Sequence, residues 1–141
     1  MQEKPTDDLS QELMEADSID SYIRDNEAVF AGQDLVEHLS ELYGRSAISK
    51  AALARRSGMS EVYLHQVFSG RRNPSRDRRL CLCIGLVATL EETQRLLKLS
   101  AYAQLYPRSR RDAIIAYGIL HHMELHAIND KLFSENEKTL S

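Results

Sequence analysis

Short amphipathic segments follow one another along most of this chain, and Ser or Thr stands directly before many of them. Their apolar residues recur at spacings of three and four, which is the period of one helix face. A Ser or Thr oxygen at such a position can accept a hydrogen bond from a free amide of the first helical turn. The candidate caps are Ser18, Ser60, Ser75, Thr89 and Ser109, and another helix is expected to begin near Ser49. With few β-branched residues and no sustained apolar/polar alternation, the sequence predicts an all-α fold.

The cap and glycine positions predict the bounds of the helices. Asp7 or Asp8 can cap a first short helix, and Gly44, Gly58 and Gly70 are expected to end three later ones. In the fourth predicted helix of the main domain, the residues expected to face inward are Leu80, Cys83, Ile84 and Val87. The helices predicted after the first 31 residues are 33–43, 49–57, 61–69, 76–87, 90–100, 110–121 and 124–134.

Three parts are expected along the chain. Residues 1–31 form an acidic, partly helical arm, and residues 32–103 form a five-helix domain. Residues 104–141 form an extra C-terminal helical hairpin packed on that domain. The hydrophobic content of 43% is enough for a real core.

The remaining composition favours a cytoplasmic protein without a membrane span. No apolar run approaches the roughly 18 residues that a span needs, and the acidic N-terminus does not have the pattern of a signal peptide. Cys81 and Cys83 lack C-x-x-C spacing, so buried reduced thiols are favoured over a metal or redox role.

The net charge of −3 hides a segregation of charge. Residues 1–44 hold two cations and twelve acids, residues 45–111 hold fourteen cations and four acids, and residues 112–141 hold two cations and five acids. The segments therefore carry −10, +10 and −3. A basic centre between acidic ends points to a polyanionic partner, although a basic helix face can also be solvated surface.

A weak repeat relates two parts of the chain at an offset of 35 residues. Arg76-Asp77 matches Arg111-Asp112, Ile84 matches Ile119, Leu90 matches Leu125 and Leu97 matches Leu132. Two copies of one helical hairpin would produce this pattern, and so would a chance similarity of two amphipathic hairpins.

Residues 50–69 have the pattern of a helix-turn-helix. Ala54 is small enough to let the second helix approach closely, and Gly58 can adopt positive φ in the turn. Four apolar residues can fill the space between the helices: Leu53, Met59, Leu64 and Val67. The other face of the second helix is left free.

This pattern resembles the phage-repressor and Cro-like (XRE) helix-turn-helix regulators. The similarity covers roughly residues 35–100, and it includes the segment Ser69 to Ser75 after the second helix and Leu90-Glu91-Glu92 near the end. It implies a five-helix repressor-like domain that binds double-stranded DNA as a transcriptional regulator, without catalytic activity or a cofactor. The stretch from Tyr106 to Leu132 resembles a C-terminal extension seen in some bacterial members.

The resemblance also implies which residues contact DNA. On the free helix face, base-edge contacts fall to Ser60, Glu61, Val62, His65, Gln66 and Ser69. Phosphate contacts fall to Lys50, Arg71, Arg72, Asn73 and Arg76. Glu61 departs from the pattern, because an acid there can accept from cytosine or can instead weaken DNA binding. A protein-interaction adaptor that keeps this fold without DNA binding is therefore the alternative.

The remaining candidates are a metal site and a dimer face. His122, His126 and Asp130 would share a face of a continuous helix, but a turn is expected there, and surface histidines explain them without a metal. No catalytic motif is present. A homodimer is expected because one such domain covers a short DNA site. Its face would use some of Ile114, Ile115, Tyr117, Ile119, Leu120, Leu132 and Phe133, which otherwise pack within the chain.

Overall fold

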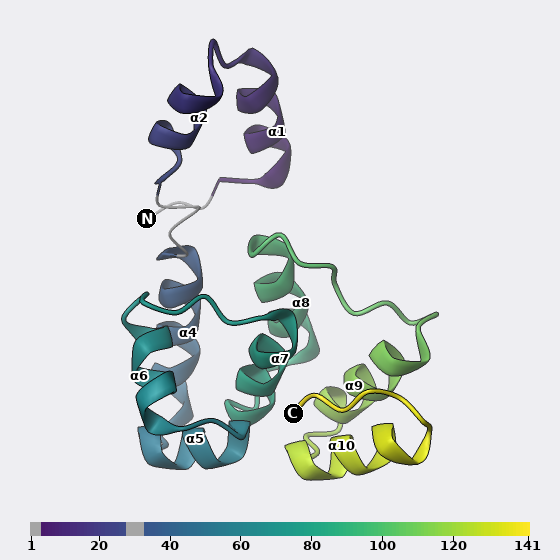
Figure 1. Cartoon of the computed structure of the whole chain (residues 1–141). Helices are drawn as coiled ribbons and strands as arrows, with labels where there is room; N and C mark the ends of the chain where they lie inside the picture. The colour runs from purple at the N-terminus through teal and green to yellow at the C-terminus, as the bar shows by residue number, and fades with distance from the viewer. Residues whose placement is uncertain (1–3, 28–32) are drawn as a thin grey trace.

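The computed structural model describes residues 4–27 and 33–141, and all regular structure within these ranges is helical (Figure 1). The all-α prediction is therefore confirmed for the described residues. The helices are α1 (Thr6–Glu15), α2 (Ile19–Asp25), α4 (Gln33–Ser46), α5 (Lys50–Ser57), α6 (Glu61–Phe68), α7 (Arg76–Gly85), α8 (Leu90–Leu99), α9 (Arg110–Leu120) and α10 (Leu125–Ser134).

The predicted caps explain where most helices begin. The side-chain oxygens of the five predicted Ser and Thr caps accept a backbone N–H from the residue three positions on. Ser49 caps α5 in the same way. At α8 the cap is reciprocal, because the Glu92 side chain also accepts from the Thr89 N–H at 2.9 Å. Local hydrogen bonding thus sets these helix starts.

Three predicted details are wrong. Gly44 does not end α4, which continues to Ser46 and turns at Ala47, with φ of 56°. The prediction for residues 76–87 is two residues too long: Val87 has φ of 54° and is 50% exposed instead of facing inward. Asp7 and Asp8 do not cap α1. They lie in its first turn, where acids favour the helix dipole.

Two hydrophobic cores meet at α7. The first joins the inner faces of α4, α5 and α6 to Leu82 and Cys83 of α7, to Leu86 directly after α7 and to Leu96 of α8. The second contains Leu80, Cys81 and Ile84 on the other side of α7, together with buried residues of α8, α9 and α10. Because α7 contributes to both cores, it joins the α4–α6 helices to the α9–α10 hairpin.

The offset-35 similarity is a repeat of backbone geometry. The turns of the α7–α8 and α9–α10 hairpins place Val87 and His122 at φ of 54°, and the hairpins end with Ala101 and Asn136 at φ of 59°. The backbone hydrogen bonds of the two turns also repeat at the same offset. After each hairpin, a side-chain amide holds the segment that follows. Gln94 accepts from the Leu105 N–H, and Asn129 accepts from the Leu140 N–H. Residues 76–105 and 111–140 therefore fold as two equivalent units.

Paired arginines join the two units. Arg76 binds the backbone carbonyls of Ala103 and Gln104 in its own unit, and Arg111 binds those of Lys138 and Thr139 in its own. Each also reaches across to the other unit. Arg76 binds Asp112 in two hydrogen bonds, and Arg111 binds Asp77 in the same way. The contact is reciprocal, as in an interface with two-fold symmetry.

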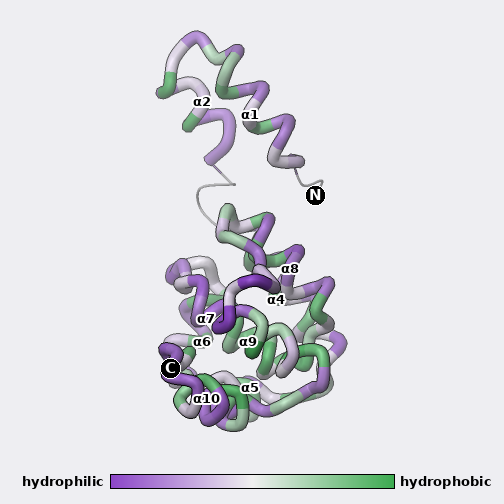
Figure 2. The backbone as a smooth tube through the Cα atoms, turned by 90° about the vertical axis from the view of Figure 1, so that its right-hand side faces the viewer, coloured by the Kyte–Doolittle hydropathy of each residue, from purple (hydrophilic) through white to green (hydrophobic). Residues whose placement is uncertain are grey.

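The α1–α2 hairpin lies at the end of the molecule opposite α10 (Figures 1 and 2). Asn26 is 3% exposed and ties the two helices together by donating to Glu12 and to the Tyr22 carbonyl. Lys4 donates to both Asn26 and Glu12. None of the apolar side chains of α1 and α2 is fully buried. A small polar network, with little apolar burial, therefore holds this hairpin.

Candidate nucleic-acid interface

The predicted pair of short helices is formed by α5 and α6. Gly58 closes α5 with φ of 68°, and the Met59 N–H donates to the Ala54 carbonyl at 2.9 Å. Leu53 and Ala54 of α5 and Leu64 and Val67 of α6 are buried in the first core. The inward residues and the turn predicted for 50–69 are thus confirmed, except that Met59 is only partly buried.

The opposite face of α6 is open to solvent. Five of the six predicted base-reading residues are exposed: Ser60, Glu61, Val62, His65 and Ser69. Val62 is 69% exposed, so an apolar side chain lies on this open face. Two hydroxyls already serve the backbone, since Ser60 caps α6 and Ser69 donates to the Gln66 carbonyl.

Gln66 is half-buried and already has a partner. Its Oε1 accepts from the Arg72 Nε at 2.9 Å. This bond holds the Gln66 amide at the edge of the exposed face. It uses the amide oxygen and does not involve the NH₂ group. The bond also fixes Arg72 relative to α6.

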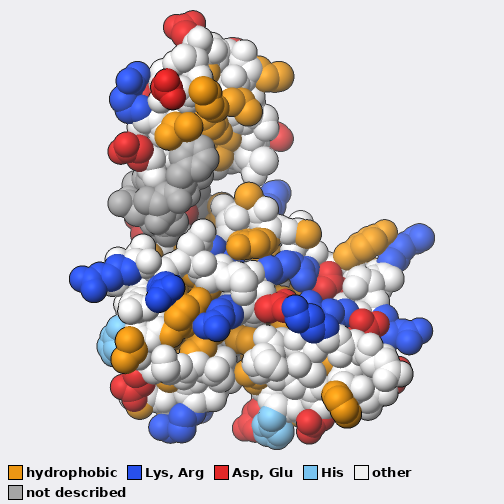
Figure 3. Space-filling model, viewed as in Figure 1, with side chains coloured by type: hydrophobic (Ala, Val, Ile, Leu, Met, Phe, Trp, Pro, Cys, Tyr) orange, Lys and Arg blue, Asp and Glu red, His pale blue; other side chains and the backbone are white. Residues whose placement is uncertain are grey.

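Exposed cations border this face. Arg71 and Arg72 follow α6, and Arg78 of α7 is stacked over the Tyr63 ring of α6 at 4.3 Å. In the space-filling view, Lys and Arg side chains gather over α6, α7 and the segment between them (Figure 3). The stacking positions Arg78 beside α6 by an attraction between cation and ring.

Three residues predicted to contact phosphate are held by other groups of the chain. Arg76 donates to Asp112 and to two carbonyls. Lys50 Nζ lies 3.3 Å from the centre of the Phe68 ring and 4.1 Å from that of Tyr43, and burial lowers the pKa of its ammonium. Asn73 is an exposed residue, but its Oδ1 accepts a hydrogen bond from the Arg79 guanidinium. The side chains of these three residues are therefore already engaged by other groups of the chain.

Arg79 anchors the segment that carries the exposed arginines. It is 3% exposed, and it donates to the Pro74 carbonyl at 2.9 Å and to the Ser100 hydroxyl at 2.7 Å. Burial lowers the pKa of this guanidinium, and the nearby Tyr102 opposes that effect. The basic run at 71–79 therefore contains both structural and exposed arginines, and the sequence pattern does not distinguish them.

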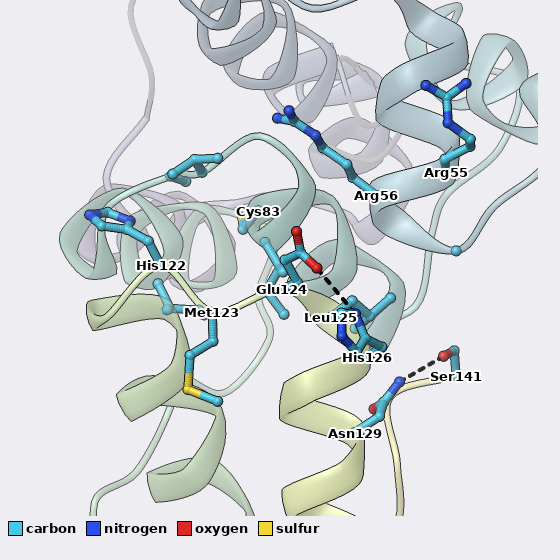
Figure 4. Close-up of a pocket in the computed structure, with 15 residues that line it drawn as sticks. Arg55, Arg56, Cys83, His122, Met123, Glu124, Leu125, His126, Asn129 and Ser141 are labelled. Carbon is cyan, nitrogen blue, oxygen red and sulfur yellow. Dashed lines mark hydrogen bonds and ion pairs between the residues drawn. The ribbon is translucent and has the colours of Figure 1, made fainter.

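Two further exposed cations, Arg55 and Arg56, come from the end of α5 and were not among the predicted contacts. They line a groove of about 570 Å³ that the α9–α10 turn borders on the other side (Figure 4). On the α10 side of the groove, the Oε2 of Glu124 lies 3.3 Å from the Nδ1 of His126. Arg55 and Arg56 both lie in the last turn of α5, and this position in the sequence could have identified them as exposed cations.

The histidines and cysteines do not form a shared site. His122 lies in the turn between α9 and α10, as expected, and His126 lies on α10. Within residues 4–27 and 33–141, no three His, Cys, Asp or Glu side chains gather in a way that could hold a metal ion. Both cysteines are buried free thiols, and burial raises the pKa of Cys81 to about 11 and of Cys83 to about 12. The predicted burial of both thiols is confirmed.

None of the described helices has the length and apolar character needed to cross a membrane. Comparisons of the chain with models of protein families, with curated proteins and with solved structures gave no match.

Proposed function

We propose that this chain binds double-stranded DNA sequence-specifically through α6 and acts as a transcriptional regulator without catalytic activity. The carrying observation is the division of α6 into two faces. Leu64 and Val67 are fully buried, while Val62 and His65 on the other side are exposed. A helix with such a free face, held firmly from behind, can enter a major groove.

The exposed arginines provide the electrostatic part of the proposal. Arg71, Arg72 and Arg78 flank the free face, and phosphate contacts of this kind supply affinity and fix the orientation of the helix. In this proposal Arg76, Lys50 and Asn73 have a supporting role, because their polar atoms already bind within the chain.

The resemblance to repressor-like regulators agrees with this assignment. Five helices, α4 to α8, span the residues of that resemblance, and the residues with the helix-turn-helix pattern form α5 and α6, which supports the proposal. Glu61 occupies the first turn of α6, where it is exposed and Ser60 serves as the cap. In the proposal, Glu61 is a base-reading acid that accepts from cytosine N4 and excludes other bases.

The test begins with selection of genomic fragments by the purified chain. Affinity for a selected duplex and for a random duplex is then measured over a salt series. Arg71→Ala with Arg72→Ala should weaken binding to both duplexes and flatten the slope of log K against log salt by about one unit per lost phosphate contact.

The matched control removes two exposed cations elsewhere, Lys98→Ala with Arg108→Ala. It lowers the net charge equally and should leave the slope nearly unchanged. An equal loss in both double variants would assign binding to general charge. No retention of the wild-type chain on duplex DNA at low salt would favour the protein-interaction adaptor.

A further inference from the structure

An apolar groove runs between α9 and α10 on the outside of the molecule. Its volume is about 420 Å³, and its apolar lining includes Ile114, Tyr117, Met123 and Ile128. Two charged residues line it, Arg110 and Lys131, and both are cations. Tyr117 is 60% exposed, so the groove is open to a partner.

The repeat shows what covers the equivalent surface in the first unit. At an offset of 35, Tyr117, Met123 and Lys131 correspond to Leu82, Ala88 and Leu96. These three are at most 2% exposed, because they share a core with residues of α4, α5 and α6. Within that core α4 packs against α8 and α5 packs against α7. The surface of the second unit thus has the form of a helix-binding surface without its helices.

The helix α1 has the same sequence pattern as α4. Both contain Asp-Leu, a second Leu four residues after the first, and a Glu two residues after that. In α4 these leucines are Leu35 and Leu39, which are 6% and 0% exposed. In α1 the second leucine is Leu13, which is 50% exposed and is followed by Met14 at 80%. Apolar side chains are visible together on the α1–α2 hairpin (Figure 3).

Charge also matches the two surfaces. Residues 1–31 hold nine acids and two cations, and four of the acids lie on α1: Asp7, Asp8, Glu12 and Glu15. The charged residues that line the groove are both cations, although the Lys131 Nζ also lies 3.1 Å from the Oε1 of Glu135, the residue after α10. An acidic amphipathic helix is the occupant that such a groove favours.

We infer that the α1–α2 hairpin of a second copy of this chain docks in the α9–α10 groove. Figure 1 places the hairpin and α10 at opposite ends of one chain, and six peptide links, the number between Glu27 and Gln33, can span at most about 20 Å. Each copy has one hairpin and one groove, so reciprocal docking gives a closed dimer with two-fold symmetry.

The test measures the molecular mass of the full chain by sedimentation equilibrium over a range of concentrations. The wild type should show a reversible monomer–dimer equilibrium. An arm variant, Leu13→Glu with Met14→Glu, and a groove variant, Tyr117→Glu with Lys131→Glu, should each raise the dissociation constant at least about tenfold. Phe133→Glu, at a residue 78% exposed on α10 and outside the groove lining, is the control that should dimerise as the wild type does.

Mixing the two variants provides the decisive measurement. The arm variant keeps an intact groove and the groove variant keeps an intact hairpin, so their heterodimer has one intact contact and each homodimer has none. A 1:1 mixture should therefore form heterodimers at concentrations at which neither variant dimerises alone. A wild type that stays monomeric, a mixture that stays monomeric, or a dimer broken only by Phe133→Glu would overturn the inference. Circular dichroism checks the fold, and Met14→Ser, a milder change that should still weaken the dimer, replaces the arm variant if that variant unfolds.

Discussion

The Arg76 guanidinium makes two hydrogen bonds to the Asp112 carboxylate, at 3.2 Å from Nη1 to Oδ1 and at 3.0 Å from Nη2 to Oδ2. The pair joins residues 36 positions apart, and its counterpart joins Arg111 to Asp77. Both pairs are mostly shielded, with side-chain exposures of 24% or less. Bidentate pairs of this kind combine strength with a fixed geometry.

Asp112→Asn is expected to lower the free energy of unfolding more than Asp77→Asn does. Both changes should cost about 1–3 kcal/mol, since each leaves an arginine half-buried without its anion. The loss of unfolding free energy should be larger for Asp112→Asn because the Asp112 Oδ2 also accepts a hydrogen bond from the Tyr106 N–H at 3.0 Å. Urea unfolding measures the difference, with the exposed Asp130→Asn as the control. The reverse order of the two costs would contradict the prediction.

Gly118→Ala is expected to destabilise the second unit by about 1–3 kcal/mol, the usual cost of overpacking a core. A Cβ at Gly118 would stand 2.5 Å from two atoms of the Ile128 side chain, which is fully buried. In an Ile128→Ala background both atoms are gone, so the added cost of Gly118→Ala should fall to less than half. Thermal unfolding of the four chains completes the cycle, and simple additivity of the two changes would exclude this clash as the cause.

Gln66→Ala is expected to relax base preference at one position of the selected duplex, with a loss of roughly 1–3 kcal/mol there. Binding to random duplex should change little. Because Gln66 also holds Arg72, the salt slope is measured in the same experiment. A loss of equal size on selected and random DNA would mean that this amide supports Arg72 and reads no base.

Acid is expected to open the α1–α2 hairpin. The hydrogen bonds from Lys4 and Asn26 lower the pKa of the Glu12 carboxyl below its ordinary value of 4.5. A carboxyl whose pKa is lowered on folding stabilises the fold above 4.5, and that contribution is lost as the pH falls through the lowered value. The protection of the α1 and α2 amides, which is their exchange rate relative to an unfolded chain at the same pH, should therefore fall below pH 4.5. Glu12→Gln should remove this pH dependence, and an unchanged loss of protection in that variant would assign it to another group.

The features that follow from local sequence were predictable. The starts of α5, α6, α7, α8 and α9 depend on a cap and the residue three positions later, and the turn at Gly58 depends on one glycine. The continuation of α4 past Gly44 was not predictable from that glycine. A Cβ added there would meet nothing within 4 Å, so no close approach or turn requires a glycine, and the next helix cap, Ser49, lies further on.

The roles of the basic residues were not predictable from their spacing. Arg76, Arg78 and Arg79 lie within four positions of one another, yet one binds a distant carboxylate, one stacks on a ring and one is buried against carbonyls. Their partners lie on other elements of the fold. Likewise the offset of 35 residues indicated two hairpins, while the reciprocal ion pairs between them appear only when both units are in place.

Arg76 and Arg111, which bridge the two units, also affect how the chain unfolds. In tandem helical hairpins the terminal one normally frays first, since only one neighbour supports it. Here Arg111 sits at the start of the last hairpin and is bound both to the segment after α10 and to Asp77 of the preceding unit. Local unfolding of the α9–α10 hairpin must therefore break the Arg111–Asp77 pair, which also holds the α7–α8 hairpin. The slowest-exchanging amides of α7 and α9 should consequently open together, as a single cooperative block with one common free energy.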